Sequence, residues 1–119
     1  MTPLGTRIRA LRAARGVTQK RMAEDLQISA AYLSSLEHGR RGRPSRMLIL
    51  QMGVYFELGW EAQEELESLV RLSNPRVMVD TAGLSPKATE LANLLARRIA
   101  RLSGSAVERL LRILQDEKT

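Results

Sequence analysis

Apolar residues recur every three or four positions along the first 72 residues, the spacing that places them on one face of an α-helix. This spacing predicts five helices, over 4–15, 19–26, 30–37, 44–56 and 60–72. Capping residues mark several boundaries: Gly16 ends the first helix, and Thr18 and Ser29 are N-caps of the second and third. Pro44 suits the first turn of the fourth. The pattern indicates a small all-α domain.

The helical spacing of apolar residues is interrupted at the start of the last third of the chain. Asn74-Pro75 is a stop signal, and residues 76–81 are expected to be extended or a very short strand. Ser85-Pro86 then begins a helix over 87–102, and a capping box at 105–108 opens a last helix. We therefore divide the chain into a domain over 1–72 and a C-terminal helical extension over 73–119.

Two sets of side chains are expected to fill the core instead of forming a binding surface. Four methionines at helical or strand spacing belong to the first set: Met22, Met47, Met52 and Met78. The second set is aromatic, and its members are expected to close the bottom of the small core: Tyr55, Phe56 and Trp60.

The positive charge is concentrated in one half of the chain. Residues 1–59 hold ten basic and four acidic side chains, whereas residues 60–119 hold nine of each. The whole net charge of +6 therefore belongs to the half with the short capped helices. Such an asymmetry favours a polyanionic partner for that half.

Composition argues against several other kinds of function. The chain has no cysteine and one histidine, His38, which leaves too few groups for a histidine-rich metal site or a conventional acid–base pair. We expect no catalytic residues, no metal and no cofactor, and hence no enzyme. Neither a membrane span nor a signal peptide is visible, so we expect a cytoplasmic protein without membrane contact.

Residues 4–60 resemble the DNA-binding domain of the phage-repressor and Cro class, the xenobiotic-response-element family of bacterial regulators. The first helix and the entry to the second carry Gly5-x-x-Ile8-x-x-Leu11-Arg12, followed by Gly16-Val17-Thr18-Gln19. The second helix, the turn and the third helix carry Met22-Ala23-x-x-Leu26, Ile28-Ser29 and Leu33-x-x-Leu36-Glu37-x-Gly39. The resemblance implies a five-helix repressor-like DNA-binding domain. It also implies double-stranded operator DNA as the partner of a two-fold symmetric homodimer.

The resemblance also implies roles for particular residues. Gln19 corresponds to the glutamine that opens the second helix and bonds a DNA phosphate, and a helix N-terminus suits an anion. Arg12 and Glu37 correspond to an internal ion pair with a structural role. The third helix presents a face to the major groove that comprises Ser29, Ala30, Ala31, Tyr32, Ser34 and Ser35.

Two features depart from the family pattern. Gln27 stands in the turn where many members have glycine, so it must adopt an unusual backbone conformation or alter the turn. The front of the third helix lacks glutamine, asparagine and arginine, and therefore lacks bidentate contacts worth about 1–3 kcal/mol of base discrimination each. We expect specificity to depend on DNA shape and on outlying arginines.

An arginine-rich loop follows the third helix. Its Arg41-Gly42-Arg43-Pro44 resembles the core of the AT-hook, which implies minor-groove contact. In an alternative interpretation the loop has no binding role: its arginines are solvated, and it ends in a proline that begins the next helix. We favour a third interpretation, in which Arg40, Arg41 and Arg43 contact backbone phosphates.

The leucine-rich helices of the extension need a surface to cover them. We expect a homodimer through Leu91, Leu95, Ile99, Leu110 and Leu114, with packing inside the monomer as the alternative. The sequence thus predicts a transcriptional regulator, with repression favoured, that binds a palindromic operator. A second hypothesis is an antitoxin-type interaction module whose C-terminal helices bind another protein while the N-terminal domain regulates its own gene.

Overall fold

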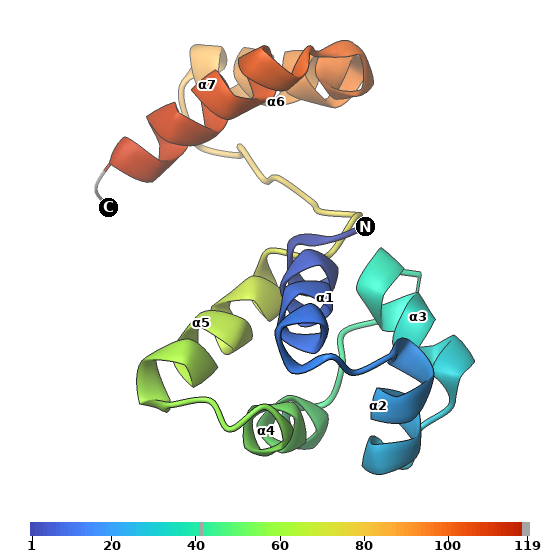
Figure 1. The fold of residues 1–119 in the computed structure, drawn as a ribbon. Helices are drawn as coiled ribbons and strands as arrows, with labels where there is room; N and C mark the ends of the chain where they lie inside the picture. The colour runs from blue at the N-terminus through green and yellow to red at the C-terminus, as the bar shows by residue number, and fades with distance from the viewer. Residues whose placement is uncertain (41, 118–119) are drawn as a thin grey trace. The chain divides into compact units, whose positions relative to one another are not determined.

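The structure is a computed structural model that describes residues 1–40 and 42–117 (Figure 1). Its chain divides into two compact units, residues 1–77 and 78–119. The first unit is five residues longer than the domain assigned from the sequence. Ser73 explains part of the difference, because its Oγ accepts a hydrogen bond from the backbone N–H of Leu4 (2.9 Å).

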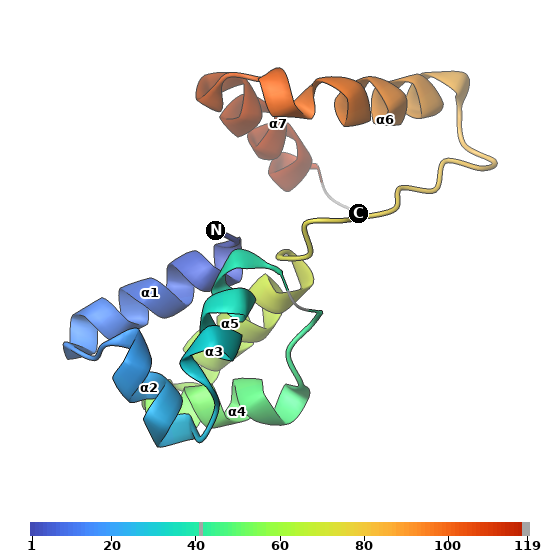
Figure 2. The ribbon, with the colours of Figure 1, turned by 90° about the vertical axis from the view of Figure 1, so that its right-hand side faces the viewer.

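Five helices form the first unit: α1 (Pro3–Arg15), α2 (Gln19–Leu26), α3 (Ala30–His38), α4 (Arg46–Tyr55) and α5 (Trp60–Arg71). Helix α1 packs against α3 and α5, α2 packs against α3, and α4 packs against α5. As Figure 2 shows, α2 and α3 lie together on one side of the unit with α5 behind α3. The prediction of an all-α fold is confirmed.

The core contains one apolar face from each of the five helices. Its fully buried side chains include Leu4 and Ile8 of α1, Met22 of α2, Leu33 of α3, Met52 of α4 and Leu66 of α5. The expected core roles of Met22, Met52 and Phe56 are therefore confirmed. The expected core positions of three other residues were wrong: Met47 is 63% exposed, Trp60 is 78% exposed and Met78 is 95% exposed.

Local hydrogen bonds at the helix ends account for the boundaries. Thr18 Oγ1 accepts from Arg21 N and Ser29 Oγ from Tyr32 N, each at 3.0 Å, and Gly16 ends α1 in the left-handed conformation. The fourth helix begins later than expected, because Ser45 Oγ accepts from Leu48 N and is the N-cap. Pro44 therefore lies outside α4 and not in its first turn.

The second unit contains α6 (Pro86–Arg98), a short 3₁₀-helix η1 (Ile99–Arg101) and α7 (Gly104–Asp116). Ser85 caps α6 as predicted, but Ser103, not Ser105, caps α7. The strand considered for 76–81 does not form: these residues have no regular secondary structure. None of the residues in α6, η1 or α7 is buried.

None of the described helices is long and apolar enough to cross a membrane.

Candidate nucleic-acid interface

The turn between α2 and α3 is closed by its own backbone. Gln27 has φ +58° and ψ +40°, which is the left-handed conformation, so of the two alternatives that the sequence left open it adopts the unusual backbone. This reversal lets Ile28 N donate to Ala23 O (3.0 Å) and places Ile28 against the core. Ser29 then caps α3 at once. The result is a short, well-braced connection between two helices.

Helix α3 has one face in the core and one face outside. Leu33, Leu36 and Glu37 are buried, whereas Ala30 and Ala31 at its start are exposed. Ser34 and Ser35 are half-buried along the same helix, and Ser29 at its N-cap is exposed. The outer side is thus made of small side chains, which allows the helix backbone to approach a flat or grooved partner closely.

Tyr32 lies at the boundary between the core face and the outer face of α3. Its side chain is half-buried and packs against the edge of the core, which the sequence argument had not anticipated. The ring therefore contributes to folding as well as to the outer surface. A variant at this position would change both properties, so Tyr32 is a poor choice for testing DNA contact alone.

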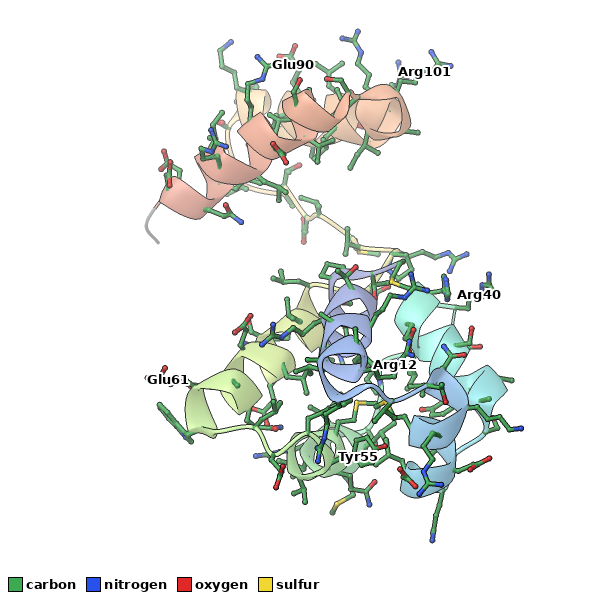
Figure 3. All side chains as sticks on the ribbon, in the orientation of Figure 1. Arg12, Arg40, Tyr55, Glu61, Glu90 and Arg101 are labelled. Atoms are coloured by element: carbon green, nitrogen blue, oxygen red, sulfur yellow. The ribbon has the colours of Figure 1, made fainter. Side chains whose placement is uncertain are left out.

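A buried ion pair fixes α3 against α1. Arg12 Nη2 lies 3.2 Å from Glu37 Oε1 and 3.3 Å from Oε2, and the side chain of Glu37 is 0% exposed (Figure 3 labels Arg12). The backbone carbonyl of Glu37 is engaged as well, because it accepts from Thr2 N (3.1 Å) and from Thr2 Oγ1 (3.2 Å). The sequence offered no signal for the contact with Thr2.

The N-terminal end of α2 carries cations on the outer surface. Gln19, its first residue, is half-buried, and Lys20 and Arg21 follow it as exposed side chains. Arg21 also pairs with Asp25 one turn later (3.2 Å). A helix N-terminus with neighbouring cations favours an anion such as a phosphate.

Asp25 also connects α2 to α4. It accepts a hydrogen bond from the phenol of Tyr55 (2.7 Å), whose ring is in turn covered by the guanidinium of Arg15 at 5.8 Å (Figure 3 labels Tyr55). Burial, and then the hydrogen bond to Asp25, raise the pKa of Tyr55 above its ordinary value of 10.0. Sequence reasoning missed this network because its members come from three helices.

The loop after α3 presents further positive charge. Arg40 and Arg43 are exposed, and Figure 3 shows Arg40 next to the end of α3. Arg41 lies outside the described residues. The three ion pairs among the described residues do not involve Arg40 or Arg43. These two cations are therefore available to an external anion.

The described residues line a small cavity near the candidate interface and, along α1, a wider hollow of about 570 Å³ that is open to solvent. They contain no group of three or more His, Asp or Glu side chains that could hold a metal ion. A small cavity of about 70 Å³ lies between the loop after α3 and the chain that leaves α5. Ligand pockets usually measure several hundred Å³, so this cavity is too small for a substrate.

Two helices joined by a tight turn, with the second held rigidly and presenting a small-residue face, define a helix-turn-helix domain. A family model described as a helix-turn-helix domain matches residues 3–69, which is more than half of the chain. The chain belongs to this family, and the resemblance to the xenobiotic-response-element class is confirmed.

One relative among curated proteins is an uncharacterized HTH-type transcriptional regulator, RghRB, of Bacillus subtilis (strain 168). It is 34% identical over 61 residues, which are 51% of this chain and 44% of the relative. The chain thus spans less than half the length of the relative it matches. No solved structure matches the chain significantly.

Proposed function

We propose that the protein is a DNA-binding transcriptional regulator that places α3 in the major groove of its operator. The observation that carries this proposal is the outer face of α3: small side chains, held rigidly by the Arg12–Glu37 pair, with cations on both sides. A helix of this kind fits the groove, which is about 12 Å wide. The name of the Bacillus relative supports the same role.

The proposed contacts fall into two groups. Gln19, Arg40, Arg41 and Arg43 contact phosphates, and these contacts orient the domain without reading sequence. Ser29, Ala30, Ala31, Tyr32, Ser34 and Ser35 face the bases. Because alanine and serine make few discriminating contacts, the flexibility and shape of the operator supply much of the specificity.

The regulator is proposed to act as a homodimer on a palindromic operator. The support comes from the second unit, where Leu91 is 60% exposed, Ile99 is 54% exposed and Leu114 is 66% exposed. Apolar side chains at helical spacing on α6 and α7, with no buried residue in either helix, need a partner surface. A second copy supplies one and places two α3 helices on successive turns of DNA.

Repression is the simplest output of such a protein. A dimer bound over a promoter blocks polymerase by occupying the site, and this requires no catalytic group. Activation would require a surface that contacts polymerase in addition to DNA. We therefore propose a repressor without enzymatic activity.

The experiment that tests this function is selection from random DNA duplexes with the full-length protein at two salt concentrations. Enrichment of a palindrome with half-sites about 10 bp apart is the expected result. Binding without enrichment at either salt concentration would contradict a sequence-specific regulator. Binding that does not weaken with salt would contradict a phosphate-dominated interface.

The exposed leucines of α6 and α7 also favour a second candidate function. In that case the second unit binds a different protein, as an antitoxin binds its toxin, and the first unit regulates the gene. Sedimentation of the purified protein distinguishes the two candidates. A dimer at micromolar concentration supports the homodimer, whereas a monomer with the leucines still exposed favours a separate protein partner.

A further inference from the structure

The start of the segment that leaves α5 is anchored beside the C-terminal end of α3. Ser73 Oγ accepts from Leu4 N (2.9 Å) and donates to Leu69 O (2.5 Å), which joins this segment to α1 and α5. The side chain of Asn74 then accepts from Arg76 N at 3.0 Å and turns the chain. These hydrogen bonds give residues 73–76 a defined course.

Pro75 places this course directly against the end of α3. A Cβ atom added to Gly39 would lie 3.3 Å from Pro75 Cδ and 2.8 Å from Thr2 Cγ2, so there is no free space between the two segments. Gly39 ends α3 with φ +71°, and Arg40 follows it. The small cavity described above is lined from both sides, by Gly39, Gly42 and Arg43 and by Ser73, Asn74 and Pro75.

Three exposed arginines therefore come from neighbouring backbone positions: Arg40 after α3, Arg43 in the following loop and Arg76 directly after Pro75. The sequence contains no acidic residue over 38–56 or over 68–79. The ion pairs formed by the described residues do not include Arg76. Like charges at this density repel one another unless an anion lies between or beside them.

We infer that Arg76 extends the DNA interface beyond the helix-turn-helix motif, as a contact to a backbone phosphate of the duplex that α3 occupies. This inference rests on the proposed DNA binding and adds a residue that lies in neither α2 nor α3. DNA is the partner that fits, because its phosphates are regularly spaced and a guanidinium can donate two hydrogen bonds to one of them. Arg40 and Arg43 would occupy phosphates adjacent to the one at Arg76.

Anchoring makes this contact more effective than one from a free linker. A mobile arginine would lose backbone and side-chain freedom on binding, and this loss of conformational entropy would weaken the contact. The hydrogen bonds of Ser73 and Asn74 already restrict the backbone before DNA is present. The contact would not discriminate among bases, and its loss should weaken binding to all sequences equally.

The test compares three full-length proteins, namely the parent, Arg76→Gln and the control Arg71→Gln. Both substitutions remove one exposed positive charge. Arg71 follows the buried Leu66 by five residues, so it lies on the opposite side of α5 and away from the core. The probe is a fluorescein-labelled 30-bp duplex of mixed sequence, and its anisotropy is measured between about 50 and 300 mM salt, the range in which phosphate contacts dominate.

For Arg76→Gln we expect a log–log salt slope shallower by about 0.9 per protomer, and about eight-fold weaker binding per lost contact at 0.1 M salt. Arg71→Gln should retain the parent slope. Identical slopes in all three proteins would overturn the role of Arg76 while leaving DNA binding intact. Equal losses in the two variants would also overturn it, because the effect would then be one of net charge. A parent that does not bind the duplex would contradict the proposed function itself.

Discussion

Arg12 of α1 and Glu37 of α3 form a salt bridge in the interior of the domain, with N–O distances of 3.2 and 3.3 Å and exposed side-chain fractions of 11% and 0%. The pair lies at the end of α3 opposite the helix-turn-helix turn. The turn holds one end of α3 and this ion pair holds the other, so together they fix the direction of the helix axis. A change in this direction would move the outer face of the helix with respect to the groove.

Glu37→Gln should destabilise the domain strongly. Removing one partner of a buried pair leaves the other charge uncompensated, which typically costs about 3–5 kcal/mol. Urea denaturation of the full-length protein measures the loss. Glu57→Gln is the control, because Glu57 pairs with Arg15 at 3.4 Å but is 81% exposed. An exposed pair contributes about 0–1 kcal/mol, so similar losses in the two variants would contradict the structural role of Glu37.

Gly5→Ala should also destabilise the domain, through backbone contact and not through charge. A Cβ atom at residue 5 would lie 2.0 Å from the carbonyl oxygen of Glu37, so α1 and α3 would have to separate. Overpacking of this kind costs typically 1–3 kcal/mol, and we expect about 3 kcal/mol or more because the obstacle is backbone. Gly104→Ala is the control, because the added methyl group has open space around it. Its midpoint urea concentration of unfolding should equal that of the parent. A Gly5→Ala protein as stable as the parent would contradict the close packing of α1 against α3.

The phenol of Tyr55 should ionise at a higher pH than an ordinary tyrosine. Its half-buried position and its hydrogen bond to Asp25 both favour the neutral form, so the folded pKa lies above the unfolded value of 10.0. The stabilisation from this proton is complete below about pH 10 and is lost as the pH rises through the folded pKa. Alkaline absorbance titration of the parent minus Tyr55→Phe isolates this transition. Asp25→Asn should move it to lower pH, and an unchanged transition would remove Asp25 as a cause.

The exposed leucines of the second unit should hold two copies together. Leu91→Glu combined with Leu114→Glu should convert a dimer to a monomer in sedimentation, because each substitution places a charge in an apolar interface. Both side chains are more than half exposed in the single chain, so its own fold should be preserved. Val54→Glu, at a position that is 79% exposed on α4, is the matched control. A double variant that remains dimeric would place the interface elsewhere.

Local signals account for the parts of the fold that the sequence predicted well. The N-caps Thr18, Ser29 and Ser85 act within three residues of the chain. For Gln27 the sequence left open an unusual backbone or an altered turn, and the structure has the first of these. Ser103 was missed because Ser105 offered a second, equally plausible cap one turn before the leucines. Which of the two serines caps the helix depends on the backbone conformation, and the local sequence pattern does not determine that conformation.

Exposure was harder to predict, because it depends on how helices are arranged. Met47 and Trp60 have the spacing of core residues, but α4 and α5 pack through other positions and leave both side chains outside. The anchoring of Ser73 beside Leu4 joins residues 69 positions apart, and no short motif indicates it. The contribution proposed for Arg76 depends on this anchoring and was therefore visible only in the structure.

The most direct test of the central claim is a second selection from random duplexes with the Ala31→Gln protein. Ala31 is exposed at the start of α3, so glutamine should fit there without disturbing the fold and could bond adenine in the groove. We expect the enriched sequence to change at one position in each half-site, while Ala13→Gln on α1 retains the parent sequence. An unchanged preference in the Ala31→Gln protein would contradict recognition of the operator through α3.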